Sequence, residues 1–328
     1  MLYHELKNIF YHILGTKCMG RLKDFKVNLP FLKKMKFSKA YDENTFYFVI
    51  SPYTKHPGLS DRLKAIVTCY NLAKKYGYNF KIVFKQPFAL EDFLVPNKVD
   101  WIADFNDLHY SIGHTKFFSE RKILDGNSWK HVRLTPGKEY HCYNYVGNWE
   151  PRIYPDTGLA WSELYHELFK PCGELEELLD SFPYKEKAYI AVHLRFVNAL
   201  DNFEEPSCYN NPLPDEQSKR NLIERCKEGI MEIKRRNGNC DVLVFSDSKR
   251  FLDELNDIPV HTLDGSEHIA HLSFTNDRLE TMKTFVDLYM LSKARKVYRI
   301  DAPEIYAYSK FAHSGALIGN IDFETFKV

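Results

Sequence analysis

The sequence has few of the features that mark membrane-spanning, secreted or zinc-binding proteins. No window approaches the roughly 18 apolar residues that a membrane-spanning helix needs. The N-terminus lacks the uninterrupted apolar stretch and small-residue cleavage site of a signal peptide. The seven cysteines are odd in number and scattered, with no C-x-x-C pair and no zinc-ligand spacing. We therefore expect a cytoplasmic protein with reduced thiols.

The chain also has little net charge, only +1 at pH 7. Residues 1–40 hold nine Lys and Arg residues against two acidic ones, so the rest of the chain is slightly acidic. An acidic body argues against a nucleic-acid partner. Residues 1–16 place apolar side chains at helical spacing. Two interpretations stay open for residues 1–40: peripheral contact with an anionic membrane, or packing on the body with a solvated basic rim.

Size and composition indicate an ordinary folded protein with more than one core. A chain of 328 residues favours two domains, since single cores rarely grow past about 250 residues. Hydrophobic residues make up 44% and charged residues 27%, which is enough for buried cores under a polar surface. The 21 Tyr and 24 Phe suit a protein that stacks aromatic rings on sugars, or reflect codon bias.

Alternating strand and helix patterns predict parallel, doubly wound sheets. The predicted strands are 46–51, 80–84, 130–134, 188–194, 241–245, 259–263 and 296–300, and the predicted helices are 1–16, 62–76, 161–179, 216–236 and 278–294. The pattern restarts near residue 183. We therefore divide the chain into a basic helical segment, 1–43, and two α/β domains, 44–182 and 183–328.

Ligands of open α/β sheets bind beyond the carboxyl ends of the strands, so polar residues there are candidates for a site. Gly58 to Arg62 follow the first strand, where a glycine and a helix N-terminus suit an anion, although an ordinary turn has the same composition. His193 and Arg195 end a buried apolar strand. Arg195 is predicted either to clamp a pyrophosphate or to pair with an internal carboxylate.

Two further polar segments follow later strands. Ser246 and Asp247 end an apolar strand, and Asp247 is predicted to accept hydrogen bonds from a ribose or base, or to cap the next helix. The segment 308–317 opens onto a helix of small residues and is predicted to cradle phosphates, or to be a plain helix start capped by Ser309. The candidate ligands in this last segment are Ser309, Phe311, His313 and Ser314.

In chain order these segments resemble the superfamily of GDP-fucose-dependent fucosyltransferases, which includes the bacterial α-1,2 and α-1,6 enzymes and the protein O-fucosyltransferases. That superfamily has an early Gly-x-x-Asn-Arg loop, a His-x-Arg strand end and a strand ending in Ser/Thr-Asp. Near its C-terminus it has an Asp-Leu-x-x-(Leu/Met)-Ser helix, a strand and a Ser-x-Phe-Ser loop. The matching positions here are Gly58–Arg62, His193–Arg195, Ser246–Asp247, Asp287–Ser292, 297–300 and Ser309–Ala312.

This sequence departs from the pattern at three positions. Asn198 stands where the superfamily often has an acidic residue, Ala312 replaces the second serine, and Asp61 replaces the common asparagine. These departures keep two alternatives open. One is a GT-B transferase for another nucleotide sugar, and the other is a catalytically inactive carbohydrate-binding protein.

The resemblance implies a GT-B fold, two Rossmann-like domains with a cleft between them, in which the C-terminal domain holds the donor. It implies an inverting glycosyltransferase that moves L-fucose from GDP-fucose to a glycan or lipid-linked oligosaccharide at the inner face of a bacterial membrane. Arg195 would clamp the diphosphate, while His193 and Asp247 would meet the guanine and ribose. No Asp-x-Asp cluster is present, and we expect neither metal nor cofactor. Asp201, Glu204 and Glu205 are the candidates for a general base.

Overall fold

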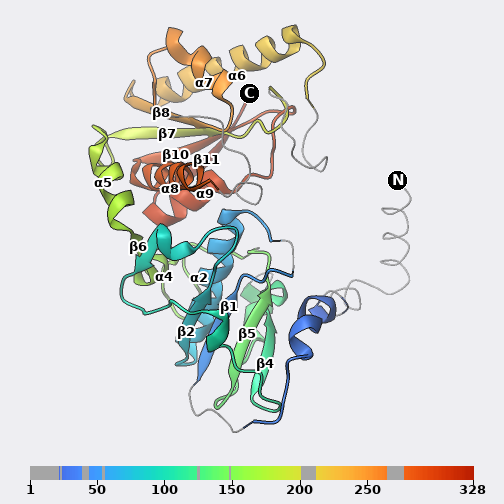
Figure 1. Cartoon of the computed structure of the whole chain (residues 1–328). Helices are drawn as coiled ribbons and strands as arrows, with labels where there is room; N and C mark the ends of the chain where they lie inside the picture. The colour runs from blue at the N-terminus through green and yellow to red at the C-terminus, as the bar shows by residue number, and fades with distance from the viewer. Residues whose placement is uncertain are drawn as a thin grey trace. The chain divides into compact units, whose positions relative to one another are not determined.

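The structure is a computed structural model that describes residues 22, 24–38, 44–53, 56–123, 126–147, 149–200, 212–263 and 277–328. The predicted helix over residues 1–16 lies outside these ranges. Two compact units make up the chain (Figure 1). The first comprises the described residues up to Pro57 together with Asp61–Gln86 and Val99–Glu150, and the second comprises Gly58–Ser60, Pro87–Lys98 and Pro151–Val328.

The first unit is built on a parallel four-stranded sheet of order β2-β1-β5-β4. Its elements are β1 (Thr45–Val49), α2 (Leu59–Lys75), β2 (Asn79–Val83), η2 (Phe105–Asp107), β4 (Thr115–Ser119), η3 (Glu120–Lys122), α3 (Gly126–Lys130) and β5 (Glu139–Asn144). The helical residues 24–32 bring Phe31 against Tyr47, Val49 and Tyr143, which form one core cluster of this unit.

The second unit is built on a parallel five-stranded sheet of order β11-β10-β7-β8-β9. Its sheet elements are β7 (Tyr189–Leu194), α6 (Glu216–Arg236), β8 (Asp241–Ser246), α7 (Lys249–Asp253), η4 (Glu254–Asp257), β9 (His261–Thr262), α8 (Arg278–Lys293), β10 (Lys296–Asp301), α9 (Phe311–Gly319) and β11 (Asp322–Lys327). The unit also holds η1 (Leu90–Asp92), α4 (Trp161–Leu168), α5 (Gly173–Ser181) and an antiparallel pair of β3 (Leu94–Pro96) with β6 (Phe169–Pro171).

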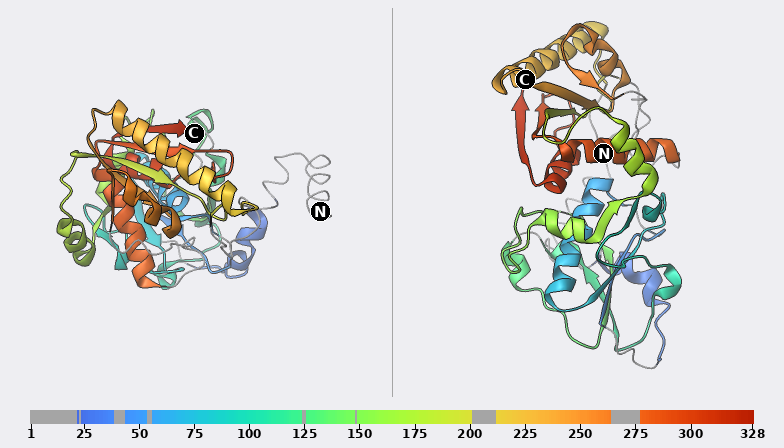
Figure 2. Two further views of the ribbon diagram at one scale, coloured as in Figure 1. Left: turned by 90° about the horizontal axis from the view of Figure 1, so that it is seen from above. Right: turned by 90° about the vertical axis from the view of Figure 1, so that its left-hand side faces the viewer.

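Helices cover both faces of the five-stranded sheet. Figure 1 shows α6 and α7 on one face and α8 and α9 on the other, and Figure 2 shows the α6 layer from two further sides. Ile190, Val192 and Leu194 of β7 belong to the core cluster under α6 and α7. Side chains alternate along a strand, so Ala191 and His193 face the other layer.

Most predicted elements are present, and the predicted helix 216–236 coincides with α6. Residues 130–134 are not a strand, because Lys130 ends α3 and a loop follows. The predicted helix 161–179 is also wrong. It is divided into α4, β6 and α5, since Pro171 has no N–H to continue a helix and disfavours helical backbone at Lys170. β4, β5 and β11 were not predicted.

The structure divides the chain at a different place from the predicted boundary between residues 182 and 183. Residues 151–182 fall in the second unit, where α4 packs on α9 and α5 packs on α8. The five cysteines in the described ranges are free: Cys69, Cys142, Cys172, Cys226 and Cys240. None of the described helices combines the length and the apolar character that crossing a bilayer would require.

Candidate functional site at the switch point of the second unit

The strand order of the second unit reverses between β7 and β10. From β7 the chain proceeds through α6 to β8 and then β9, whereas β10 and β11 lie on the other side of β7. Such a topological switch point is where open α/β sheets bind ligands, outside the carboxyl ends of the strands. His193 of β7 is the register partner of Arg299 of β10 at this point. The two predicted residues His193 and Arg195 therefore lie at the place where the fold favours a ligand.

A buried carboxylate fixes the turn that carries Arg195. Asp247 follows β8, and its side chain is only 4% exposed. Its Oδ1 accepts a hydrogen bond from the Phe196 amide at 2.8 Å and its Oδ2 one from the Val197 amide at 2.9 Å. Arg195 Nη1 lies 3.3 Å from Oδ2. Asp247 thus holds both the backbone after β7 and the guanidinium of Arg195.

The same turn stores backbone strain at Val197. Val197 has a φ of 51°, a conformation that a β-branched residue rarely adopts. Strain of this kind costs on the order of 1–3 kcal/mol and persists only where the surroundings impose it. The hydrogen bonds that the Phe196 and Val197 amides donate to Asp247 impose this conformation on the turn. The turn is therefore held in one conformation before any ligand arrives.

The helix after β8 is capped by a residue other than Asp247. Ser248 is the N-cap of α7, and its side chain accepts from the Phe251 amide at 3.2 Å. Ser246 Oγ accepts from the Ser248 amide at 3.1 Å. The predicted cap role of Asp247 is therefore wrong. Its predicted contact with a ribose stays a prediction, and the structure supports a positioning role.

His193 is buried in its neutral form. Burial, together with the nearby guanidinium groups of Arg195 and Arg299, lowers its pKa to about 3. Its ring lies 5.5 Å from the Phe311 ring, centroid to centroid. Within the described ranges, its Nδ1 is buried and has no hydrogen-bond partner. A neutral imidazole with an open nitrogen is suited to a hydrogen bond with a base or a sugar hydroxyl.

The N-cap residue of α9 makes no side-chain cap hydrogen bond. This residue is Lys310, whose side chain has no acceptor atom and has the same sign of charge as the helix end. The predicted alternative of Ser309 as the cap is therefore wrong. Ser314 in the first turns is fully buried, and its Oγ has no partner among the described residues. His313 packs beside Phe323 at 5.0 Å. The N–H groups that begin α9 are suited to an anion.

The early loop is used differently from the prediction. Gly58 directly precedes α2, and Arg62 lies in its first turn. Arg62 is 2% exposed, and it donates from Nε to the Pro57 carbonyl at 2.8 Å and from Nη1 to the Gln86 carbonyl at 3.1 Å. Its guanidinium lies over the Phe84 ring. These contacts join two loops of the first unit, and donor binding by Gly58 and Arg62 stays a prediction.

Three predicted residues have no structural description. The candidate bases Asp201, Glu204 and Glu205 lie outside the described residues. Asn198 and Ala312, two of the three departures from the superfamily pattern, are both buried. The sequence reasoning did not single out Arg299. A charged residue between the apolar residues of a predicted strand could have pointed to Arg299. Its position beside His193 could not be predicted, because it depends on strand register.

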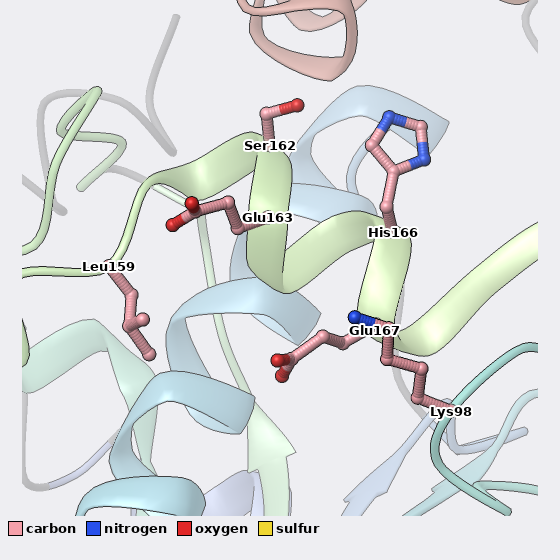
Figure 3. Close-up of a pocket in the computed structure, with 6 residues that line it drawn as sticks. All are labelled: Lys98, Leu159, Ser162, Glu163, His166 and Glu167. Carbon is pink, nitrogen blue, oxygen red and sulfur yellow. The ribbon is translucent and has the colours of Figure 1, made fainter.

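A separate pocket lies on α4 (Figure 3), with a volume of about 370 Å³. It is lined by Lys98, Leu159, Ser162, Glu163, His166 and Glu167. The Ser162 hydroxyl donates to the Ile318 carbonyl at 2.6 Å, and His166 Nε2 lies 3.1 Å from the same oxygen. The two glutamates would repel a diphosphate, so we do not assign the donor site to this pocket.

No protein-family model matches the chain, and no curated protein sequence matches it. Solved structures do match. The NodZ α-1,6-fucosyltransferase soaked with GDP-fucose superimposes with a TM-score of 0.55 at 16% identity, over 84% of this chain and 93% of that one. NodZ co-crystallised with GDP gives a TM-score of 0.55 at 15% identity, over 84% of this chain and 93% of that one. A variant of Arabidopsis thaliana FUT1 in complex with GDP superimposes with a TM-score of 0.50 at 12% identity, over 96% of this chain and 78% of that one.

The chain therefore shares its fold with fucosyltransferases. The predicted α/β fold class of the GT-B type is confirmed by the two parallel sheets and by this likeness. The predicted resemblance to the fucosyltransferase superfamily is confirmed at the level of fold.

Proposed function

We propose that the protein is a glycosyltransferase that binds GDP-fucose in its second unit and transfers the fucose to a hydroxyl of a glycan. The observation that carries this proposal is the cationic switch point. The guanidinium groups of Arg195 and Arg299 lie near a neutral His193, whose ring packs beside Phe311 at the start of α9, and Asp247 is an ion-pair partner of Arg195. This arrangement lies in a fold shared with structures that hold GDP or GDP-fucose.

The reaction would proceed by inversion at the sugar. The acceptor hydroxyl oxygen attacks the anomeric carbon, and the bond from that carbon to the diphosphate oxygen breaks with its electron pair on GDP. The hydroxyl proton passes to a base, for which Asp201, Glu204 and Glu205 stay the candidates. Negative charge grows on the diphosphate as the bond breaks. Arg195, held by Asp247, would stabilise that charge, which is usually a large catalytic contribution.

We also propose that the transfer needs no metal ion. Guanidinium groups stabilise phosphate charge through parallel hydrogen bonds, which is one of the roles that a divalent cation has in other transferases. A buried carboxylate and a strained turn hold Arg195 in this protein, which supports the proposal that its guanidinium takes that role.

A nucleotide screen tests the donor assignment. We expect GDP to stabilise the chain in thermal unfolding more than UDP or CMP does at equal concentration. A ligand at 100 times its Kd stabilises the folded state by about 2.7 kcal/mol, which is an easily measured shift. Preferential stabilisation by UDP or CMP would indicate another donor. Binding of GDP and glycan with neither transfer nor hydrolysis of GDP-fucose would indicate an inactive carbohydrate-binding protein.

The acceptor and the membrane contact are further parts of the proposal. We propose a glycan or lipid-linked oligosaccharide as the acceptor, with residues 1–40 resting on an anionic bilayer. Each basic residue near such a surface contributes about 1 kcal/mol. Co-sedimentation with anionic vesicles should therefore fall with salt and disappear on deletion of residues 1–40. Binding that survives the deletion would rule out this role for the segment.

A further inference from the structure

We infer that Arg299 is a second diphosphate-binding residue, acting beside Arg195 at the switch point between β7 and β10. This inference rests on the proposed function for the identity of the anion. The position follows from the sheet itself, because Arg299 and His193 are register partners on adjacent parallel strands. Residues paired in this way point to the same face of the sheet, and Arg195, two residues after His193, continues that face beyond the end of β7.

A hydrogen bond orients the guanidinium of Arg299 from its Nη1 side. Nη1 donates to the Ser309 carbonyl at 3.0 Å, just before the start of α9. In the described part of the chain, Nε is buried without a hydrogen-bond partner. The Nε and Nη2 groups form the edge that makes two parallel hydrogen bonds to a phosphate or carboxylate. Because Nη1 is engaged by Ser309 and Nε has no partner among the described residues, we assign the Nε and Nη2 edge to the diphosphate.

Arg299 differs from Arg195 in its ion pairing within the described residues. Arg195 has Asp247 as its partner, whereas no ion pair of Arg299 is recorded in the described ranges. Lys310, the N-cap of α9, adds another positive charge next to Ser309. A cation beside a helix N-terminus interacts unfavourably with the helix dipole, whereas an anion bound there interacts favourably with both the dipole and the cation.

Two more buried polar atoms indicate a ligand rather than a structural brace. Ser314 is fully buried and His193 is 5% exposed, and neither Ser314 Oγ nor His193 Nδ1 has a partner among the residues described. Native structures rarely leave buried polar atoms unsatisfied, and an unoccupied ligand site is one explanation. Arg299 Nε, His193 Nδ1 and Ser314 Oγ belong to three adjoining elements, β10, β7 and α9.

Isothermal titration of the full chain with GDP, guanosine and inorganic pyrophosphate tests the inference. We expect Arg299→Gln to weaken GDP binding at least about tenfold and to leave guanosine binding unchanged, because the lost contact is charge-assisted and made to phosphate. Arg299→Lys keeps the charge and should restore part of the affinity. Arg295→Gln is the matched control. Arg295 precedes β10 at the opposite end of the strand, where it donates to the Asn237 carbonyl.

The outcomes separate this inference from the proposed function. Unchanged GDP affinity in Arg299→Gln overturns the inference and leaves the proposed function standing. Equal losses for GDP and guanosine, with a lower melting temperature, show a brace for Ser309 and also overturn it. Pyrophosphate binding that depends on Arg299, in a chain that ignores GDP, rejects the proposed donor and supports the anion site. If the unaltered chain binds neither GDP nor pyrophosphate, both the proposed function and this inference are rejected.

Discussion

The two units have the same kind of switch point but use it in opposite ways. In the first unit the strand order reverses between β1 and β5. There His56 Nε2 lies 2.6 Å from the Ser51 carbonyl, and its Nδ1 lies 2.7 Å from the Tyr145 hydroxyl. The neutral ring thus donates to one and accepts from the other, so both of its nitrogens are satisfied. In the second unit, His193 Nδ1 is left without a partner among the described residues.

The carboxylates beside the two switch points show the same contrast. Glu120, after β4, accepts with Oε2 from the Val146 and Gly147 amides at 2.7 and 3.1 Å, just as Asp247 accepts from the turn after β7. The turn in the first unit is unstrained, because Gly147 adopts its positive φ of 63° without penalty and a Cβ there would lie 2.3 Å from the Asp61 carbonyl oxygen.

The turn in the second unit has Val197 at the equivalent place, with strain and an arginine attached. Equivalent backbone geometry is therefore achieved cheaply in one unit and at a conformational cost in the other. Strain that persists beside unsatisfied polar atoms is typical of a functional site. The comparison supports the proposal that the second unit binds the ligand, while the recorded contacts of the first unit's switch point are internal to that unit.

The largest expected difference is between the two carboxylates. Asp247→Asn loses one of two amide acceptors and the partner of Arg195, and we expect a loss of about 3 kcal/mol in the free energy of unfolding. Glu120→Gln keeps an oxygen for both amides. Burial raises the pKa of Glu120, so loss of its charge is cheaper, and we expect about 1 kcal/mol or less. Urea unfolding of both variants measures the difference, and equal losses would contradict the comparison.

The two arginines should separate binding from stability. Arg195→Ala should lower transfer at least tenfold while the fold survives, because a charge-assisted contact contributes roughly 1.5–3 kcal/mol. Arg62→Ala leaves the Pro57 and Gln86 carbonyls without their donor and should lower the melting temperature instead. The paired measurements are GDP-fucose turnover and thermal unfolding. Near-normal turnover in Arg195→Ala, or weaker donor binding by a fully stable Arg62→Ala chain, would reverse the assignment.

The two buried histidines give a smaller, pH-dependent effect. Burial lowers the pKa of His193 to about 3 and that of His56 to about 4. The unfolded chain takes up these protons near pH 6.5, while the folded chain does not. The stability that the two neutral histidines contribute is therefore fully present above pH 6.5. It is lost as the pH falls, by up to about 1.4 kcal/mol per pH unit for each histidine.

A bound nucleotide should distinguish the two histidines. The diphosphate charge would raise the pKa of His193 and so reduce its share of the pH dependence between pH 6.5 and 5. His56 lies in the other unit and should be unaffected. We expect GDP to flatten the pH profile of stability in the unaltered chain and in His56→Gln, but not in His193→Gln. The same flattening in all three chains would place the effect elsewhere.

Much of the second unit could be predicted from the sequence, and much of the first could not. Strands β7 and β8 contain apolar runs, and α6 is amphipathic and begins at the cap Asp215. β5 is fully buried but carries Glu139 and His141, which pair at 2.5 Å. Polar residues that satisfy one another inside a core remove the hydrophobic pattern from which strands are recognised.

Only part of the candidate site, likewise, could be predicted from the sequence. Arg195 could be recognised because it ends an apolar strand, and Asp247 because it ends the next one. Their pairing, the reassignment of the cap to Ser248 and the involvement of Arg299 all depend on which strands are neighbours and in which register. Sequence periodicity does not specify either, because a strand pattern gives the face of a residue but not its partner.

The smallest expected effect concerns metal ions, and it completes the contrast between the units. If Arg195 and the start of α9 hold the diphosphate, removal of divalent cations should leave transfer essentially unchanged. We expect the same rate in excess chelator as in buffer with added Mg²⁺ or Mn²⁺. Arg195→Ala provides the control, because partial rescue of that variant by Mn²⁺ would show that a metal can replace the guanidinium at the phosphates. A strict requirement for metal in the unaltered chain would mean that the cationic switch point does not stabilise the leaving group by itself, since a guanidinium clamp acts without a metal.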